Sequence, residues 1–283
     1  MMRTKMIQSI AVIGLLAIAI ASCKSTKKSD TTTENVMVSA VSKPVGKDTI
    51  TIKNIRRVQR DSLGLFAVVF DVPTSGSDIM KNAITEWISE ELEGSYEGEL
   101  TDVEKMADYY MDKVLKRNYE TASEFKAESG QDQLNYEDST TINKFYESDA
   151  FITYSYVSDG YTGGAHGYHI YKGQTFRKSD GRRIGWDVFQ RTYSVEFMNL
   201  IRDGLKEYWE VKTDEELDDM LMDKDNFSVR PLPDCPPLFE KKGVTFVYNQ
   251  YEIAPYAAGL PSFTIPYEKL IPFMNATAKK LIK

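Results

Sequence analysis

Residues 151–178 read FITYSYVSDGYTGGAHGYHIYKGQTFRK. The segments rich in β-branched and aromatic residues, which favour strands, are 151–157, 168–172 and 174–178. Gly163 and Gly164 interrupt this pattern, and SDGR at 179–182 is typical of a turn. The middle of the chain is therefore predicted to be β-structure.

Helical and β-type segments surround this stretch in blocks. Apolar residues recur with helical spacing between Ile79 and Leu92, and TDVE at 101–104 is a capping box that starts a second helix. Further predicted elements are strands at 48–55, 63–71, 243–253 and 263–265, a long helix at 194–210, a short helix from the capping box at 213–216 to Met222, and a helix at 267–271. Because the elements do not alternate strictly, we predict an α+β fold with mainly antiparallel sheets packed with helices.

The first 22 residues have the features of an export signal. Arg3 and Lys5 precede an apolar run of 12 residues, which is too short to span a bilayer. IASC at 20–23 resembles a bacterial lipobox, in which the cysteine is acylated and becomes the new N-terminus. We therefore predict a lipoprotein signal peptide at 1–22 and lipidation of Cys23. The alternative is a plain secretory signal in which this cysteine is incidental.

Residues 23–46 are polar and poor in aromatic side chains, which predicts a flexible tether between a lipid anchor and the folded part. The expected location is the bacterial cell envelope, with the membrane and its face left open. A polar seam near residues 130–150 divides the remainder into two expected α+β sub-domains, 47–145 and 146–283.

Composition and charge limit the possible functions. With 42% hydrophobic and 27% charged residues, the 283-residue chain is typical of a globular protein and not of a disordered or polytopic membrane protein. Its 35 basic and 42 acidic side chains give a net charge of −7, which becomes −9 once the signal peptide and its two basic residues are removed. An acidic balance makes a nucleic-acid partner improbable, because phosphate binding needs a basic face.

Few side chains are available for catalysis or metal binding. His166 and His169 are three apart, which on a strand places them on opposite faces, and HExxH, paired CxxC and GxSxG motifs are absent from the sequence. No metal and no cofactor are expected. Cys235 lies among four prolines and is interpreted as a structural thiol. A pair of carboxylates stays possible in so acidic a chain, although nothing selects one pair.

Two segments resemble a known bacterial envelope domain. They are YTGGAHG at 161–167, and YEIAPYAAG at 251–259 followed by FTIPYEKL at 263–270. The family is shared by the extracellular part of the anti-sigma factor RsiV and the region preceding the catalytic domain of the peptidoglycan deacetylase PdaC. The resemblance covers residues 150–275 and implies a non-catalytic α+β module, with residues 47–145 as its companion domain.

These observations predict a lipid-anchored, non-enzymatic envelope protein. Its partners would be the lipid bilayer, through acylated Cys23, and a peptidoglycan fragment or a lysozyme-like basic protein. The alternatives are a carboxylate-dependent cell-wall glycan hydrolase and a scaffold lipoprotein. The candidate binding residues are Tyr161, Gly163, Gly164, His166, Tyr168 and Tyr256, the aromatic and imidazole rings for contact and the glycines for the shape of the loop.

Overall fold

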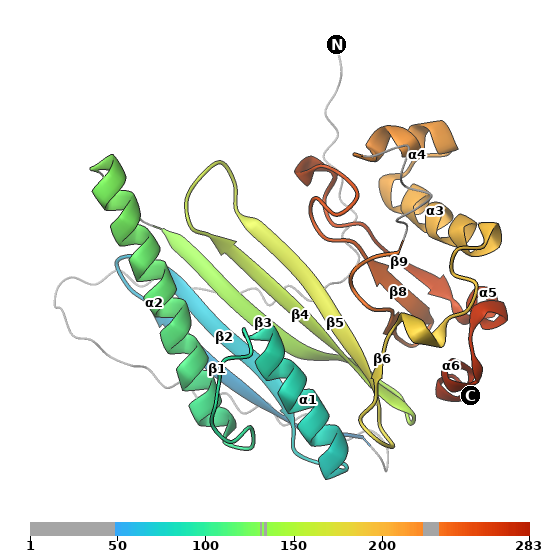
Figure 1. The fold of residues 1–283 in the computed structure, drawn as a ribbon, viewed down its shortest axis with the longest axis horizontal. Coiled ribbons are helices and arrows are strands. Elements are labelled where there is room, and N and C mark those ends of the chain that lie inside the picture. Colours follow the sequence, from blue (N-terminus) through green and yellow to red (C-terminus); the bar gives the residue numbers. More distant parts are fainter. Residues whose placement is uncertain (1–48, 131, 133–134, 223–231) are drawn as a thin grey trace, which may run out of the picture. The chain divides into compact units, whose positions relative to one another are not determined.

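A computed structural model describes residues 49–130, 132, 135–222 and 232–283, so Cys23, the signal peptide and the tether lie outside the described residues. The described part is α+β, with two sheets that are mainly antiparallel and packed with helices, which confirms the expected fold class (Figure 1). Among the described residues, no helix is long and apolar enough to cross a membrane.

The larger sheet has six strands in the order of the chain. Its strands are β1 (Ile52–Arg60), β2 (Gly64–Pro73), β3 (Tyr136–Glu147), β4 (Phe151–Tyr161), β5 (Tyr168–Arg177) and β6 (Arg183–Ile184). Neighbouring strands are antiparallel except β2 and β3, which run parallel because two helices connect them. The expected strands at 168–172 and 174–178 are a single strand, β5.

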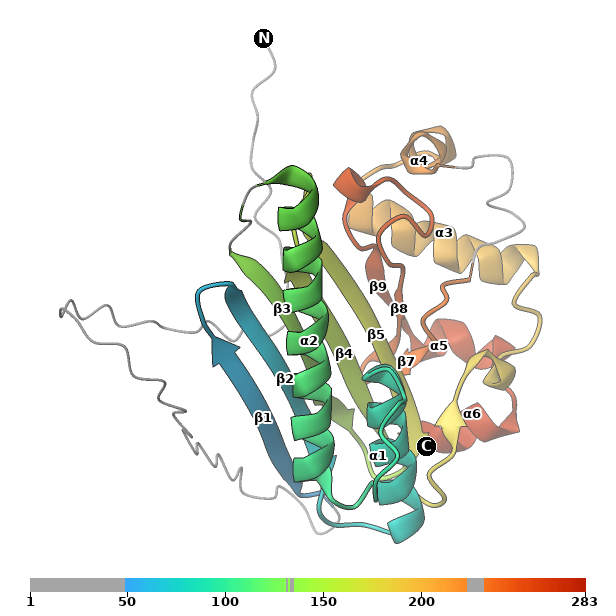
Figure 2. The ribbon, with the colours of Figure 1, turned by 60° about the vertical axis from the view of Figure 1, so that its left-hand side comes forward.

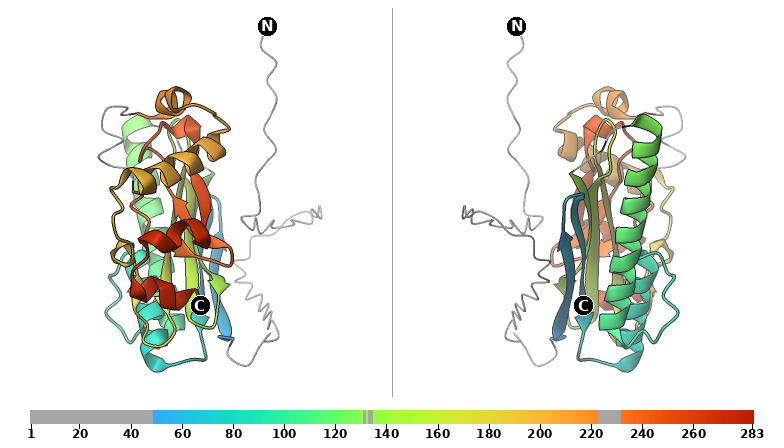
Figure 3. Two further views of the ribbon diagram at one scale, coloured as in Figure 1. Left: turned by 90° about the vertical axis from the view of Figure 1, so that its right-hand side faces the viewer. Right: turned by 90° about the vertical axis from the view of Figure 1, so that its left-hand side faces the viewer.

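Helices α1 (Asp78–Glu91) and α2 (Val103–Ser129) cover one face of this sheet, as Figure 2 and the right-hand view of Figure 3 show. Their apolar stripes bury residues such as Ile84 and Met106 against alternate side chains of the strands, such as Phe70. The N-cap of α2 is Asp102, whose side chain accepts a hydrogen bond from the Lys105 N–H, so this helix starts one residue later than a cap at Thr101 would place it.

Strand β3 was not among the predicted elements. Four of its helix-facing positions are buried, and two of these, Asp138 and Thr140, are polar, whereas Tyr136 and Ile142 are apolar. The sequence around them therefore has no clean hydrophobic alternation. The expected sub-domain boundary between residues 145 and 146 falls within β3, so the six-stranded sheet uses strands from both sides of that position.

The C-terminal part contains a second sheet and four helices. The strands are β7 (Leu238–Phe239), β8 (Gly243–Val247) and β9 (Ser262–Pro266); the helices are α3 (Val195–Trp209), α4 (Asp214–Met220), α5 (Tyr267–Leu270) and α6 (Ala276–Leu281), with short 3₁₀ turns at Trp186–Val188, Tyr256–Ala258 and Ile271–Phe273. The capping box of Thr213 and Glu216 is present. Strand β8 is shorter than the expected 243–253, because the chain turns at Tyr251, whose φ is 63°.

Hydrogen bonds join the two sheets across the face of β4 and β5 that is turned away from α1 and α2. The fully buried Thr153 hydroxyl donates to the Phe239 carbonyl at 2.7 Å and lies 3.0 Å from the Thr175 hydroxyl. The Phe239 N–H in turn donates to Thr175 at 3.0 Å. Phe239 belongs to one of the two largest hydrophobic clusters of the described part, and Thr153 lies between Ile152 and Tyr154 of the other.

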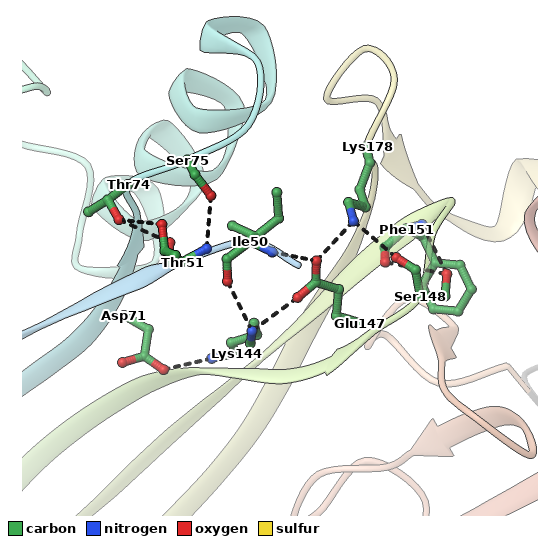
Figure 4. Close-up of polar contacts among 10 residues, drawn as sticks. All are labelled: Ile50, Thr51, Asp71, Thr74, Ser75, Lys144, Glu147, Ser148, Phe151 and Lys178. Atoms are coloured by element: carbon green, nitrogen blue, oxygen red, sulfur yellow. Dashed lines mark hydrogen bonds and ion pairs between the residues drawn. The ribbon is translucent and has the colours of Figure 1, made fainter. Parts of the chain in front are cut away.

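A nearly buried ion cluster fastens the start of the described chain to the sheet (Figure 4). The Glu147 carboxylate accepts hydrogen bonds from the Ile50 N–H at 2.8 Å, from Lys178 at 2.9 Å and from Lys144 at 3.0 Å. Lys144 also donates to the Ile50 carbonyl at 3.3 Å. The segment that enters β1 is thus held by side chains from β3 and from the turn after β5.

Candidate functional site

The connection between β4 and β5 is shaped by its glycines. Gly163 and Gly164 have φ values of 100° and 94°, a region of backbone conformation that residues with a side chain adopt at a cost in energy. The Tyr161 hydroxyl donates to the Gly164 carbonyl at 3.2 Å and closes the turn. These glycine conformations turn the chain after β4, and the exposed His166 follows two residues later.

His166 lies in an exposed group of three rings, which we call the aromatic cluster: His166, Tyr251 and Tyr256. The imidazole stacks on the Tyr256 ring, with centroids 3.9 Å apart and planes inclined by 25°. Its Nδ1 lies 2.8 Å from the Gly167 carbonyl oxygen, and its Nε2 lies 3.3 Å from the Tyr251 hydroxyl. Tyr251 is 54% exposed, so the cluster presents ring surface to the solvent.

Side chains near the cluster fix the 249–259 loop against the edge of β5. Since β6 pairs with β5 only at Thr175 and Phe176, the N–H groups earlier in β5 that point away from β4 need other acceptors. Asn249 accepts from the Tyr171 N–H at 2.8 Å, and Gln250 accepts from the His169 N–H at 3.2 Å. The 249–259 loop, which carries Tyr251 and Tyr256, is thereby held against β5, the strand that follows His166.

Glu252 stabilises the same loop from within. Its two carboxylate oxygens accept from the backbone N–H groups of Asp234 and Asn249, both at 2.7 Å. Burial raises the pKa of Glu252. Among the described carboxyl groups, this is the only one whose pKa is raised. Because both oxygens are engaged by the backbone, this carboxylate has a structural role in the loop and is poorly placed for acid–base catalysis.

Tyr168 does not join the aromatic cluster. Its side chain lies on the helix-facing side of the sheet, where its hydroxyl donates to Asp138 at 2.9 Å. His169 pairs with Asp159. The structure thus brings His166 and Tyr256 together, links Tyr161 to Gly164 within the β4–β5 connection, and separates Tyr168. Sequence reasoning missed Tyr251, although this residue opens the second of the two segments singled out above.

Metal and thiol chemistry receive no support from the described residues. No group of three or more histidine, cysteine or acidic side chains in that part of the chain could hold a metal ion. Cys235 is buried, and burial raises the pKa of its thiol to about 12, which keeps it protonated and unreactive at neutral pH.

Comparison with protein families matches residues 187–268 to a family described as "Protein of unknown function (DUF3298)". The chain carries a DUF3298 domain. The match spans the three-stranded sheet and the loop with Tyr251 and Tyr256, whereas His166 lies outside it. The aromatic cluster is therefore built partly from the DUF3298 domain and partly from the β4–β5 loop that precedes it.

Two crystal structures share this fold. A DUF3298 family member from Bacteroides fragilis NCTC 9343 is 21% identical, with a TM-score of 0.63, and the match covers 84% of this chain and 99% of that chain. A DUF3298 family protein from Pseudomonas aeruginosa PAO1 is 14% identical, with a TM-score of 0.51, over 81% of this chain and 96% of that chain. At these identities the likeness shows the fold alone. Comparison with curated proteins gave no match.

Proposed function

We propose that this chain is a lipid-anchored, non-enzymatic protein of the bacterial cell envelope. It binds a cell-wall component or a lysozyme-like basic protein through the aromatic cluster. One observation carries the proposal: residues 85 positions apart in the sequence converge to present three rings at the surface, on loops fixed by side-chain hydrogen bonds. Rigid tyrosine rings provide large contact area at a low cost in conformational entropy.

Charge and sequence resemblance support the same proposal. The net charge of −9 for a chain that begins at Cys23 favours a basic partner through long-range attraction. The segments at 161–167 and 251–259, which resemble the envelope domain of RsiV and PdaC, supply all three rings of the cluster. Lipid anchoring rests on the IASC sequence at 20–23. Among the described carboxyl groups, Glu252 is the one whose pKa is raised, as a general acid requires, and both of its oxygens already accept hydrogen bonds from the backbone.

Calorimetric titration tests the binding function. The chain lacking residues 1–23, which retains every described residue, is titrated with lysozyme and with soluble peptidoglycan fragments at low and at physiological salt. We expect saturable binding to one of them that persists at the higher salt. The double variant Tyr251→Ala and Tyr256→Ala should bind about tenfold more weakly or worse, because buried aromatic anchors dominate binding energy.

The control is Tyr193→Ala, which removes a tyrosine that is 73% exposed and lies outside the cluster. Unchanged affinity in the double variant would refute the assignment of the surface. Binding that vanishes at physiological salt would reduce the interaction to non-specific attraction by an acidic protein. The absence of binding to either ligand would refute the proposed ligand class.

A further inference from the structure

A pocket of about 240 Å³ opens on the helix-facing side of the six-stranded sheet, and none of the three residues of the aromatic cluster lines it. One row of paired residues crosses the strands and forms its floor: Val68, Thr140, Ser158 and Ile170. Tyr156 and Tyr168 border this row on either side. The wall comes from α2 and from the end of α1, including Arg117 and Glu93.

The pocket exists because α1 is short and two of the floor residues, Thr140 and Ser158, are small. Helix α1 ends at Glu91, and Glu93 turns the chain away with a φ of 86°, so α1 leaves part of β4 and β5 uncovered (Figure 2). Gly160 makes room for the Tyr168 ring beside the floor, since a Cβ at this glycine would lie 2.4 Å from ring atoms. The tyrosine is thereby held against the strand.

The floor of the pocket contains buried polar side chains. Thr140 and Ser158 are 8% and 6% exposed, with their hydroxyls 3.4 Å apart, and the 3% exposed Asp138 lies one row away. Asp138 accepts from Asn118 at 2.7 Å and from Tyr168 at 2.9 Å. Buried hydroxyls and amides between helix and sheet are unusual, because an apolar side chain would pack there without desolvation cost.

The charged groups that line the pocket are all paired. They are Glu91, Glu93 and Arg117, and their ion pairs are Glu91 with Lys172 at 2.9 Å, Glu93 with Lys113 at 3.0 Å and with Arg117, and Arg117 with Asp138 at 2.8 Å. A charged ligand would enter without an available counter-charge and would have to break one of these pairs. The electrostatics therefore select a neutral ligand.

We propose that this pocket binds one neutral, hydroxyl-rich ring, the size and chemistry of a single sugar residue. Pockets for drug-sized ligands measure about 300–1,000 Å³, so a volume of about 240 Å³ admits a smaller ligand. Thr140 and Ser158 supply hydroxyl groups that both donate and accept, and the Tyr156 and Tyr168 rings border the site. The site is separate from the aromatic cluster, and the inference does not depend on the cluster's role.

Protein-observed NMR tests the proposal with the chain lacking residues 1–23. The probes are N-acetylglucosamine, which is neutral, and two charged sugars of similar size, the cation glucosamine and the anion glucuronate. We expect saturable shifts at the Thr140 and Ser158 amides with N-acetylglucosamine, at about millimolar affinity. Both charged sugars should bind at least about tenfold more weakly.

Two variants locate the binding. Ser158→Leu fills the floor and should abolish the shifts. Ile170→Trp covers the opening from a position that is already 36% exposed, so it keeps the test valid where the first variant fails to fold. The matched control is Ile271→Trp, at an isoleucine that is 42% exposed outside the pocket. The double variant Tyr251→Ala and Tyr256→Ala should still bind N-acetylglucosamine, which separates this site from the aromatic cluster.

Three results would overturn the proposal. The first is the absence of saturable shifts with N-acetylglucosamine. The second is equal affinity for the charged sugars, which would contradict the argument from charge. The third is unchanged binding by Ile170→Trp, which would place the sugar elsewhere on the protein.

Discussion

Glu147 shows how one carboxylate can hold two distant parts of the chain together. Burial alone would raise the pKa of this group, but hydrogen bonds from Lys178, from the Ile50 N–H and from Lys144 outweigh burial and hold the pKa below its ordinary value of 4.5. A carboxyl group whose pKa is lowered by folding stabilises the protein above the unfolded-state pKa. That stabilisation is lost as the pH falls through the lower, folded-state pKa.

We predict that Glu147→Gln lowers the free energy of unfolding by about 2–3 kcal/mol at pH 7, because it leaves the nearly buried Lys178 without its carboxylate. The difference from the unsubstituted protein should shrink as the pH falls below 4.5, where that protein loses its own Glu147 contribution. Urea unfolding between pH 7 and pH 3 measures both effects. The control Glu120→Gln, at an exposed ion pair, should change stability by less than about 0.5 kcal/mol. A pH-independent difference would contradict the linkage.

At the scale of elements, the edge of β5 illustrates how a sheet is completed by side chains. Beyond its short pairing with β6, this strand has two N–H groups that find acceptors in Asn249 and Gln250. The same contacts position the loop that carries Tyr251 and Tyr256. These hydrogen bonds therefore hold the loop, and with it Tyr251 and Tyr256, against β5.

We predict that Asn249→Ala destabilises the protein by about 1–2 kcal/mol, since it leaves the N–H of the buried Tyr171 without an acceptor. Hydrogen exchange at the Tyr171 amide should accelerate, and ligand binding at the aromatic cluster should weaken along with it. Gln190→Ala, at an exposed residue, is the control and should leave exchange at Tyr171 unchanged. An unaltered Tyr171 exchange rate in Asn249→Ala would show that this contact does not hold the loop.

At the scale of the whole molecule, two hydrophobic clusters are joined through Thr153, Thr175 and Phe239. Trp87 lies in the first cluster, and Trp186 and Trp209 pack against the second. The three tryptophans of the chain therefore report separately on the two clusters.

We predict that Thr153→Val, which keeps the shape of the side chain but removes its hydroxyl, costs about 1–3 kcal/mol because the buried Phe239 carbonyl loses this donor. It should also separate the unfolding of the two clusters. Thermal unfolding of 5-fluorotryptophan-labelled protein, followed by ¹⁹F NMR, measures the midpoint at each tryptophan. Thr245→Val, at a partly exposed hydroxyl, is the control and should leave the midpoints coincident. Coincident midpoints in Thr153→Val would show that other contacts couple the clusters.

The elements that the sequence predicts well are those with a regular apolar pattern. Helix α1, helix α3 and the strands β2 and β4 have such patterns and lie close to where they were expected. Strand β3 was missed because Asp138 and Thr140 are buried through contacts with distant residues. Strand β8 was predicted to be too long. The turn at Tyr251 uses a left-handed backbone conformation, which a tyrosine in the sequence does not predict.

In the candidate site, too, local features could be predicted from the sequence and contacts between distant residues could not. The sequence by itself determined the α+β class and the turn-forming role of Gly163 and Gly164, because hydrophobic periodicity and glycine conformation are local properties. Only the tertiary structure decided that His166 stacks on Tyr256 and that the Tyr168 hydroxyl donates to Asp138 instead of joining them. The reason is physical: which side chains meet depends on strand register and on contacts between residues far apart in the chain, and neither is encoded in any single segment.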